Sequence, residues 1–167
     1  MTDAPTTDPR MVELEPSPTL AIRIVVPMAS LDLGAEFRRW MPALDEYVEE
    51  RGLERTGPVY GRYFQYGPDK VDVEIGIPLA TSPADLEPIG AGRLATIGTS
   101  SLPGGTAASV THVGSYAGLG KEYDRLHDWI HAQGREEGVA PWESYTDDMA
   151  HTADPSTLRT EVTWPLG

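Results

Sequence analysis

The chain of 167 residues contains no cysteine and few basic residues, 13 lysines and arginines against 26 aspartates and glutamates. The absence of cysteine excludes disulfide bonds, thiol catalysis and thiolate metal sites. The net charge of −13 repels phosphate backbones and anionic lipids. We therefore expect no direct contact with nucleic acid or membrane surfaces, and a cationic partner is favoured.

The sequence also lacks a long hydrophobic run and a targeting segment. Its longest apolar stretch, residues 20–31, contains Arg23 and Pro27, so it cannot span a membrane. The first residues, MTDAPTTDPR, have neither the basic region nor the apolar stretch of a secretory signal. We expect a flexible tail over residues 1–10, a single domain over residues 11–167 and a cytoplasmic location.

Apolar periodicity predicts strands first and then a helix. Residues 11–15 and 19–26 have the alternating or β-branched composition of two strands joined by a turn. Asp32 can cap the helix that follows, and Gly52 ends it. Between them, apolar residues recur at spacings of three and four and form one stripe: Phe37, Trp40, Met41, Leu44, Tyr47 and Val48. Residues 57–79 are then typical of a hairpin.

The same order of elements repeats in the second half. Strands are expected at residues 94–101 and 107–113, joined by the turn LPGG, then a helix at 116–133 and a hairpin with WESYTDD and LRTEVTWPL. A forward shift of 82 positions takes Gly52 to Gly134, and a shift of 87 takes Glu74 to Glu161. This predicts two βαββ repeats, residues 11–80 and 93–167, with a linker at 81–92.

Two such units predict an α+β fold. Their strands would form a largely antiparallel sheet with two amphipathic helices on one face. The other face, and a cleft between the two halves, would then be open to a small molecule.

An acidic residue stands among aromatic residues in the stretch PWESYTDD. Strand alternation puts Glu143 and Tyr145 on one face and Trp142 on the other. A shift of 83 makes Tyr60 and Arg62 the counterparts of this pair. Glu143 either pairs with Arg62 or another base, or lies in solvent, or forms a partly buried carboxylate in an aromatic cage. Such a cage suits flat, apolar cations.

Other groups that could carry chemistry are less specific. His127 and His131 are one helical turn apart, as metal ligands can be, with Asp124 a turn earlier. They flank the apolar stripe of their helix, where solvated roles are ordinary, so we expect no metal. Ser100 and Ser101 lack the glycines of an esterase nucleophile elbow.

The second half of the chain contains, in order, LPGGTAASVTHVGSY, a helix, PWESYTDD, Asp154–Pro155 and LRTEVTWPL. This order resembles the GyrI-like family, whose domain also binds effectors in AraC-type and MerR-type regulators. The first half, ending in VDVEIGIPL, fits as well, so the resemblance covers residues 11–166. It implies a duplicated βαββ fold with a cleft for lipophilic, often cationic molecules. We expect no cofactor. Unlike the regulators, this chain has only about ten residues before its first strand, so we expect a stand-alone version.

The family's acidic and paired aromatic positions match Glu143 and Tyr145. The resemblance therefore implies that these two residues meet a ligand, and alternation and position suggest the other pocket residues. The expected set is Glu143, Tyr145, Trp142, Tyr60, Arg62, Tyr63, Tyr116 and Trp164.

Three functions are compatible with this sequence. The first is a binding module for a lipophilic, cationic aromatic compound, with Glu143 as the counter-charge. The second is a hydrolase of electrophilic, cyclopropane-bearing genotoxins, with Glu143 and Tyr145 as catalytic residues. The third is an acidic module that binds a basic protein such as a topoisomerase, with salt-sensitive affinity.

Overall fold

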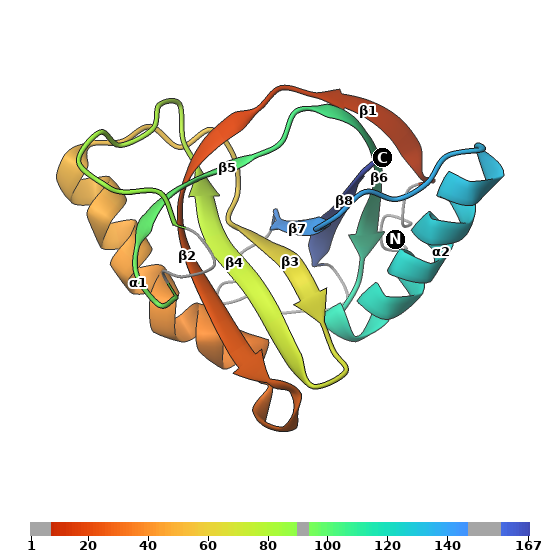
Figure 1. The fold of residues 1–167 in the computed structure, drawn as a ribbon, viewed down its shortest axis with the longest axis horizontal. Coiled ribbons are helices and arrows are strands. Elements are labelled where there is room, and N and C mark those ends of the chain that lie inside the picture. Colours follow the sequence, from red (N-terminus) through yellow and green to blue (C-terminus); the bar gives the residue numbers. More distant parts are fainter. Residues whose placement is uncertain (1–7, 90–93, 147–157) are drawn as a thin grey trace, which may run out of the picture. The chain divides into compact units, whose positions relative to one another are not determined.

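The computed structural model describes residues 8–89, 94–146 and 158–167 (Figure 1). The Asp154–Pro155 pair of the resemblance lies outside these residues. Two compact units are present: unit 1 comprises Met1–Glu15 and Gly104–Gly167, and unit 2 comprises Pro16–Pro103. The α+β fold class is confirmed, with antiparallel strand pairs and two amphipathic helices. Within the described residues, no helix is both long and apolar enough to cross a membrane.

Unit 2 is a four-stranded antiparallel sheet with one α-helix and one short 3-10 helix. Its strands are β2 (Ser17–Pro27), β3 (Tyr60–Tyr66), β4 (Lys70–Pro78) and β5 (Gly98–Leu102), and its helices are η1 (Met28–Ser30) and α1 (Leu33–Arg51). The strands lie in the order β3-β4-β2-β5. Since β3 and β4 pair directly, the predicted hairpin of residues 57–79 is confirmed.

Helix α1 begins and ends where the sequence predicts. The Asp32 side chain accepts a hydrogen bond from the backbone N–H of Ala35 at 3.0 Å, which satisfies one of the free donors of the first turn. Gly52 ends the helix in the left-handed region, with φ of 62°. The buried stripe residues Leu44 and Val48 pack against β2 and β4, which gives unit 2 its hydrophobic core.

Unit 1 repeats this design. Its strands are β1 (Arg10–Leu14), β6 (Gly105–Val113), β7 (Trp142–Tyr145) and β8 (Arg159–Pro165), and its helices are η2 (Tyr116–Gly118) and α2 (Leu119–Ala132). The order is β1-β6-β8-β7. Leu126 and Ile130 of α2 pack against Ala108, Val110 and Val162 of the sheet.

The compact units do not coincide with the two sequence repeats, because each takes one strand from the other half of the chain. Strand β1 pairs with β6, and β5 pairs with β2. The glycines of LPGG therefore do not close a hairpin between β5 and β6, and residues 15–16 do not close one between β1 and β2. The hydrogen-bond partners of these strands come from distant segments, which turn composition cannot reveal.

Candidate functional site

Strand β7 puts Glu143 on the side of its sheet that faces α2. Glu143 pairs with Val162 and Tyr145 pairs with Thr160 in the ladder to β8. Directly paired residues point to the same face of an antiparallel sheet, and Val162 belongs to the core against α2. The predicted shared surface of Glu143 and Tyr145 is therefore confirmed.

Two tyrosine hydroxyls hold the Glu143 carboxylate. Tyr123 of α2 donates to Oε2, and Tyr145 donates to Oε1, each at 2.8 Å. Glu143 itself is only 7% exposed. Hydrogen bonds to an ionised acceptor are stronger than neutral ones, so these two bonds fix both the carboxylate and the rings that carry the hydroxyls.

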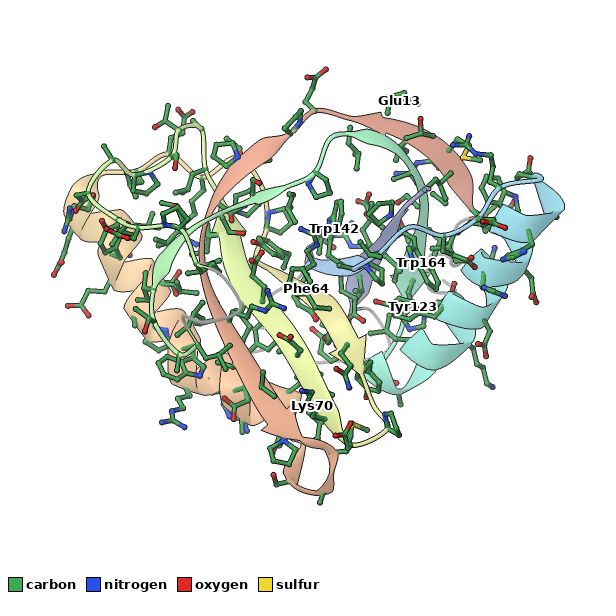
Figure 2. The ribbon with its side chains drawn as sticks, viewed as in Figure 1. Glu13, Phe64, Lys70, Tyr123, Trp142 and Trp164 are labelled. Carbon is green, nitrogen blue, oxygen red and sulfur yellow. The ribbon has the colours of Figure 1, made fainter. Side chains whose placement is uncertain are left out.

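Four half-buried aromatic rings lie at or beside this carboxylate: Tyr123 and Tyr145 donate to it, and Trp164 and Tyr116 pack on these two rings. Tyr116 meets Tyr145 edge to face with ring centroids 5.8 Å apart, and Tyr123 meets Trp164 in the same way at 5.8 Å. Figure 2 shows Tyr123 of α2 and Trp164 of β8 side by side. We call Glu143 with these four rings the Glu143 cluster. It combines a buried carboxyl group with aromatic rings that are only partly buried.

Three of the expected aromatic residues join the cluster, and Trp142 does not. Trp142 pairs with Thr163 and points to the opposite face of β7, where it is 5% exposed. Tyr123 was not predicted as a site residue, because its position in the apolar stripe of α2 indicated a core role. The hydroxyl group of Tyr123 is the feature that could have indicated a site role, since a tyrosine at the edge of such a stripe can hydrogen-bond a polar group on the adjacent sheet.

The stretch H-x-G-x-Y positions Tyr116. His112 is buried, and its Nε2 lies 2.9 Å from the carbonyl oxygen of Ser115. A Cβ added to Gly118 would lie 2.9 Å from Cε1 of His112, so this close approach needs glycine. His112 therefore packs against the backbone on both sides of Tyr116, at Ser115 and at Gly118.

The expected residues of the first half occupy unit 2, and the strand registers correct the alignment of the two repeats by one position. Tyr60 pairs with Gly76, as Trp142 pairs with Thr163. If Gly76 corresponds to Thr163 by the shift of 87, the shift in this strand is 82 instead of 83. The counterpart of Glu143 is then Gly61 instead of Tyr60.

Tyr60 belongs to a closed polar cluster of unit 2. Its hydroxyl donates to Oε2 of Glu74 at 2.6 Å and lies 3.0 Å from Oγ1 of Thr19, and Ser100 donates to Oε1 of Glu74 at 2.7 Å. Burial and the Glu74 charge raise the pKa of Tyr60 well above its ordinary value. Tyr60 is 0% and Glu74 2% exposed, whereas Ser100 is partly buried, so the role of Tyr60 in ligand binding stays a prediction.

Arg62 and Tyr63 lie on opposite faces of the same sheet. Arg62 pairs with Glu74 in the ladder, and burial lowers the pKa of its guanidinium while the Glu74 charge opposes that shift. Tyr63 is 7% exposed and belongs to the core against α1. Their roles in ligand binding stay predictions.

The two histidines of α2 meet a carboxylate other than the one expected. His131 Nε2 lies 3.0 Å from Oε2 of Glu137, and His127 Nδ1 contacts Oε1 of the same residue. Asp124 is not part of this group. Burial raises the pKa of Glu137, but hydrogen bonds from its backbone and from His131 outweigh burial, so the net shift is downward.

A sequence profile for a GyrI-like small-molecule-binding domain matches residues 7–166. No curated protein sequence matches this chain.

Solved structures of similar fold include the C-terminal domain of EcmrR, with 23% identity and a TM-score of 0.75 over 96% of this chain and 97% of that one. In a complex of EcmrR with DNA, identity is 23% and the TM-score 0.76 over 95% of this chain and 57% of that one, so the chain spans little more than half of that protein.

Two further structures match with lower identity. A hydrolase from Listeria innocua matches with 12% identity and a TM-score of 0.66 over 98% of this chain and 94% of that one. SAV2435 bound to tetraphenylphosphonium matches with 12% identity and a TM-score of 0.64 over 96% and 94%. At these identities the structures show a shared fold.

Proposed function

Because this chain belongs to the GyrI-like family of small-molecule-binding domains, related to the effector-binding domains of transcription regulators, we propose that its Glu143 cluster receives a lipophilic, cationic aromatic compound. The observation that supports this proposal most directly is the nearly buried carboxylate of Glu143 beneath half-buried aromatic rings. A cation over such a ring gains about 0.5 to 2 kcal/mol. The carboxylate supplies the counter-charge where solvent screening is weak.

The structural relatives support the same class of ligand. SAV2435 has been solved with tetraphenylphosphonium, a flat-ringed lipophilic cation. Such an ion carries little hydration, so it loses little solvation free energy when it enters an aromatic site. Its charge is then the feature that a buried carboxylate can select.

The experiment compares two ions of nearly the same shape and opposite charge. Tetraphenylphosphonium and tetraphenylborate are titrated against tryptophan fluorescence, because Trp164 belongs to the cluster. We expect the cation to bind and the anion to bind much more weakly. In Glu143→Gln the cation should bind at least about tenfold more weakly, because the variant removes the Coulomb attraction between the carboxylate and an ion that has no hydrogen-bond donor.

The matched control is Glu161→Gln. Glu161 lies next to Val162 in β8 and therefore points to the other face, where it accepts a hydrogen bond from Ser109 at 3.0 Å. This variant removes the same charge from the same pair of strands, so it should bind the cation like the wild type. Equal binding of both ions by the wild type, or an unchanged cation affinity in Glu143→Gln, would contradict the proposal.

A hydrolase is the second candidate function. The carboxylate of Glu143 already lies within 2.8 Å of two hydroxyl oxygens, so a water molecule in the place of one of them would meet a general base. One structural relative is described as a hydrolase. Mass spectrometry of the protein with cyclopropane-bearing aromatics tests this. Product from the wild type but not from Glu143→Gln supports hydrolysis, and no product from the wild type argues against it.

A further inference from the structure

We propose that His127, His131 and Glu137 bind a divalent transition-metal ion, with zinc as the best match to the three ligands. The sequence predicts no metal here, because the two histidines flank the apolar stripe of their helix, where solvated roles are ordinary. The third ligand, Glu137, lies six residues beyond His131 and meets the pair only when the chain folds back. This site is independent of the proposed ligand of the Glu143 cluster.

Helix α2 supplies the two imidazoles on one face. His127 and His131 are four residues apart, so they lie on the same face of α2 in consecutive turns. Their ring centroids are 4.4 Å apart, and both side chains are about half exposed. An ion can therefore approach from solvent without any opening of the core.

The chain after α2 reverses and returns Glu137 to the helix. Gly134 adopts a φ of 73°, which only glycine takes at little cost, and Arg135 N–H donates to the carbonyl of Ile130 at 3.1 Å. The next segment is fixed to the end of β8, because Gly138 N–H donates to Pro165 at 2.7 Å and Glu137 forms a bridge with Leu166. Glu137 is thus held in place by backbone contacts.

The three side chains offer suitable donor atoms at suitable separations. Their ligand atoms all lie within 4.8 Å of one another. Zinc bonds of about 2.0 to 2.2 Å in a tetrahedron need ligand atoms a little over 3 Å apart, so only small adjustments are required. His127 Nδ1 contacts the buried Oε1 of Glu137 and His131 Nε2 lies 3.0 Å from Oε2, so the carboxylate already faces both imidazoles.

The donor set decides which ions fit. Two imidazoles and one carboxylate suit zinc and the neighbouring first-row ions, whereas magnesium and calcium prefer oxygen ligands alone. Three protein ligands leave one tetrahedral position open for water or another molecule. The competing explanation is a simple ion pair between Glu137 and two histidines at the end of the helix, which would have no affinity for metal.

Isothermal titration with zinc chloride distinguishes these explanations. The protein is prepared without a histidine tag and treated with a chelator. We expect one zinc ion per chain in the wild type. Glu137→Gln and His131→Ala should weaken binding by more than the roughly 10- to 100-fold that loss of an outer-shell partner costs. Glu136→Gln, which removes the neighbouring exposed acid, should bind like the wild type.

Thermal unfolding gives a second readout. Zinc should raise the midpoint of the wild type and of Glu136→Gln but not that of Glu137→Gln, because a ligand that binds only the folded state stabilises it. Circular dichroism in chelator checks that each variant is folded. No saturable binding by the wild type, or equal binding by Glu136→Gln and Glu137→Gln, would overturn the site.

Nickel provides a local signal for the same site. The ring of His127 lies 6.5 Å from Trp164, so a quenching ion bound there should lower tryptophan fluorescence in the wild type and not in Glu137→Gln. Equal quenching in both proteins would show that nickel does not occupy this group. The tetraphenylphosphonium titration is run in chelator, so failure of one proposal leaves the other testable.

Discussion

At the scale of single residues, two buried carboxylates in this chain differ in what surrounds them. Glu143 and Glu74 each accept hydrogen bonds from hydroxyl groups. The rings around Glu143 are half-buried, whereas Tyr60 beside Glu74 is completely buried. The exposure of the donors, more than the acid itself, therefore separates a candidate ligand site from an internal support of the sheet.

This difference predicts a structural role for the hydroxyl of Tyr60. Tyr60→Phe removes a donor from Glu74 and should lower the free energy of unfolding by about 1 to 3 kcal/mol, because a buried acceptor loses its partner. Urea unfolding measures this. Tyr66→Phe is the control, since Tyr66 is 62% exposed and its change should be within about 0.5 kcal/mol. Equal effects in the two variants would contradict the role.

The raised pKa of Tyr60 also predicts how stability varies with pH. The unfolded chain releases this proton near the ordinary pKa of about 10, whereas the folded chain retains it to higher pH. The contribution of Tyr60 is therefore fully present below about pH 10 and is lost as the pH rises further. Urea unfolding between about pH 8 and pH 11 should show a steeper fall for the wild type than for Tyr60→Phe. If the free energies of unfolding of the two proteins fell equally with pH, Tyr60 would not be the source of the pH dependence.

At the scale of elements, helix α2 performs separate tasks on neighbouring faces. Leu126 and Ile130 pack into the core of unit 1. Tyr123, His127 and His131, spaced by four residues, form a line beside that stripe and reach Glu143 and Glu137. One amphipathic helix thus connects the core to both candidate sites.

Two glycines at helix ends should respond oppositely to alanine. Gly52→Ala should destabilise the protein by about 1 to 2 kcal/mol, because φ is 62° and a side chain disfavours that region. Gly120→Ala should stabilise it by up to about 1 kcal/mol, because this residue lies inside α2 and an added Cβ would meet nothing within 4 Å. Thermal unfolding of both variants measures the signs, and the same sign in both would refute this account.

At the scale of the whole molecule, the chain forms two compact units, each with its own hydrophobic core. Each unit includes a strand from the other half of the sequence, since β1 pairs with β6 and β5 with β2. The N-terminal segment is therefore structural from Arg10 onward. It completes the sheet that carries Glu143.

Removal of residues 1–15 should affect β6 first. The backbone groups of β6 would lose their partners on β1. The β6 amide hydrogens that face β1 should therefore exchange at least about fivefold faster, at roughly 1 kcal/mol for each lost hydrogen bond. Exchange in β2 and β4 should change little. Removal of residues 1–9 leaves β1 intact and is the control. Equal protection of β6 in both truncated proteins would contradict this assignment.

The sequence by itself determined the local features of this protein. Hydrophobic period, a capping aspartate and a terminal glycine predict α1, and strand alternation puts Glu143 and Tyr145 on one face. These features depend on residues close together in the chain, so their physical causes can be read there. The resemblance carried by short stretches such as WESYTDD identified the family.

The tertiary structure alone decided which distant residues meet. Tyr123 donates to Glu143 and Glu137 contacts His131 only because the chain folds back. In the same way β1 pairs with β6 and β5 with β2, so each unit contains one strand from the other half of the chain. With Gly76 matched to Thr163, the ladder registers also make Gly61, and not Tyr60, the counterpart of Glu143. These outcomes depend on packing and ladder register among segments far apart in sequence, and composition and periodicity contain no record of that.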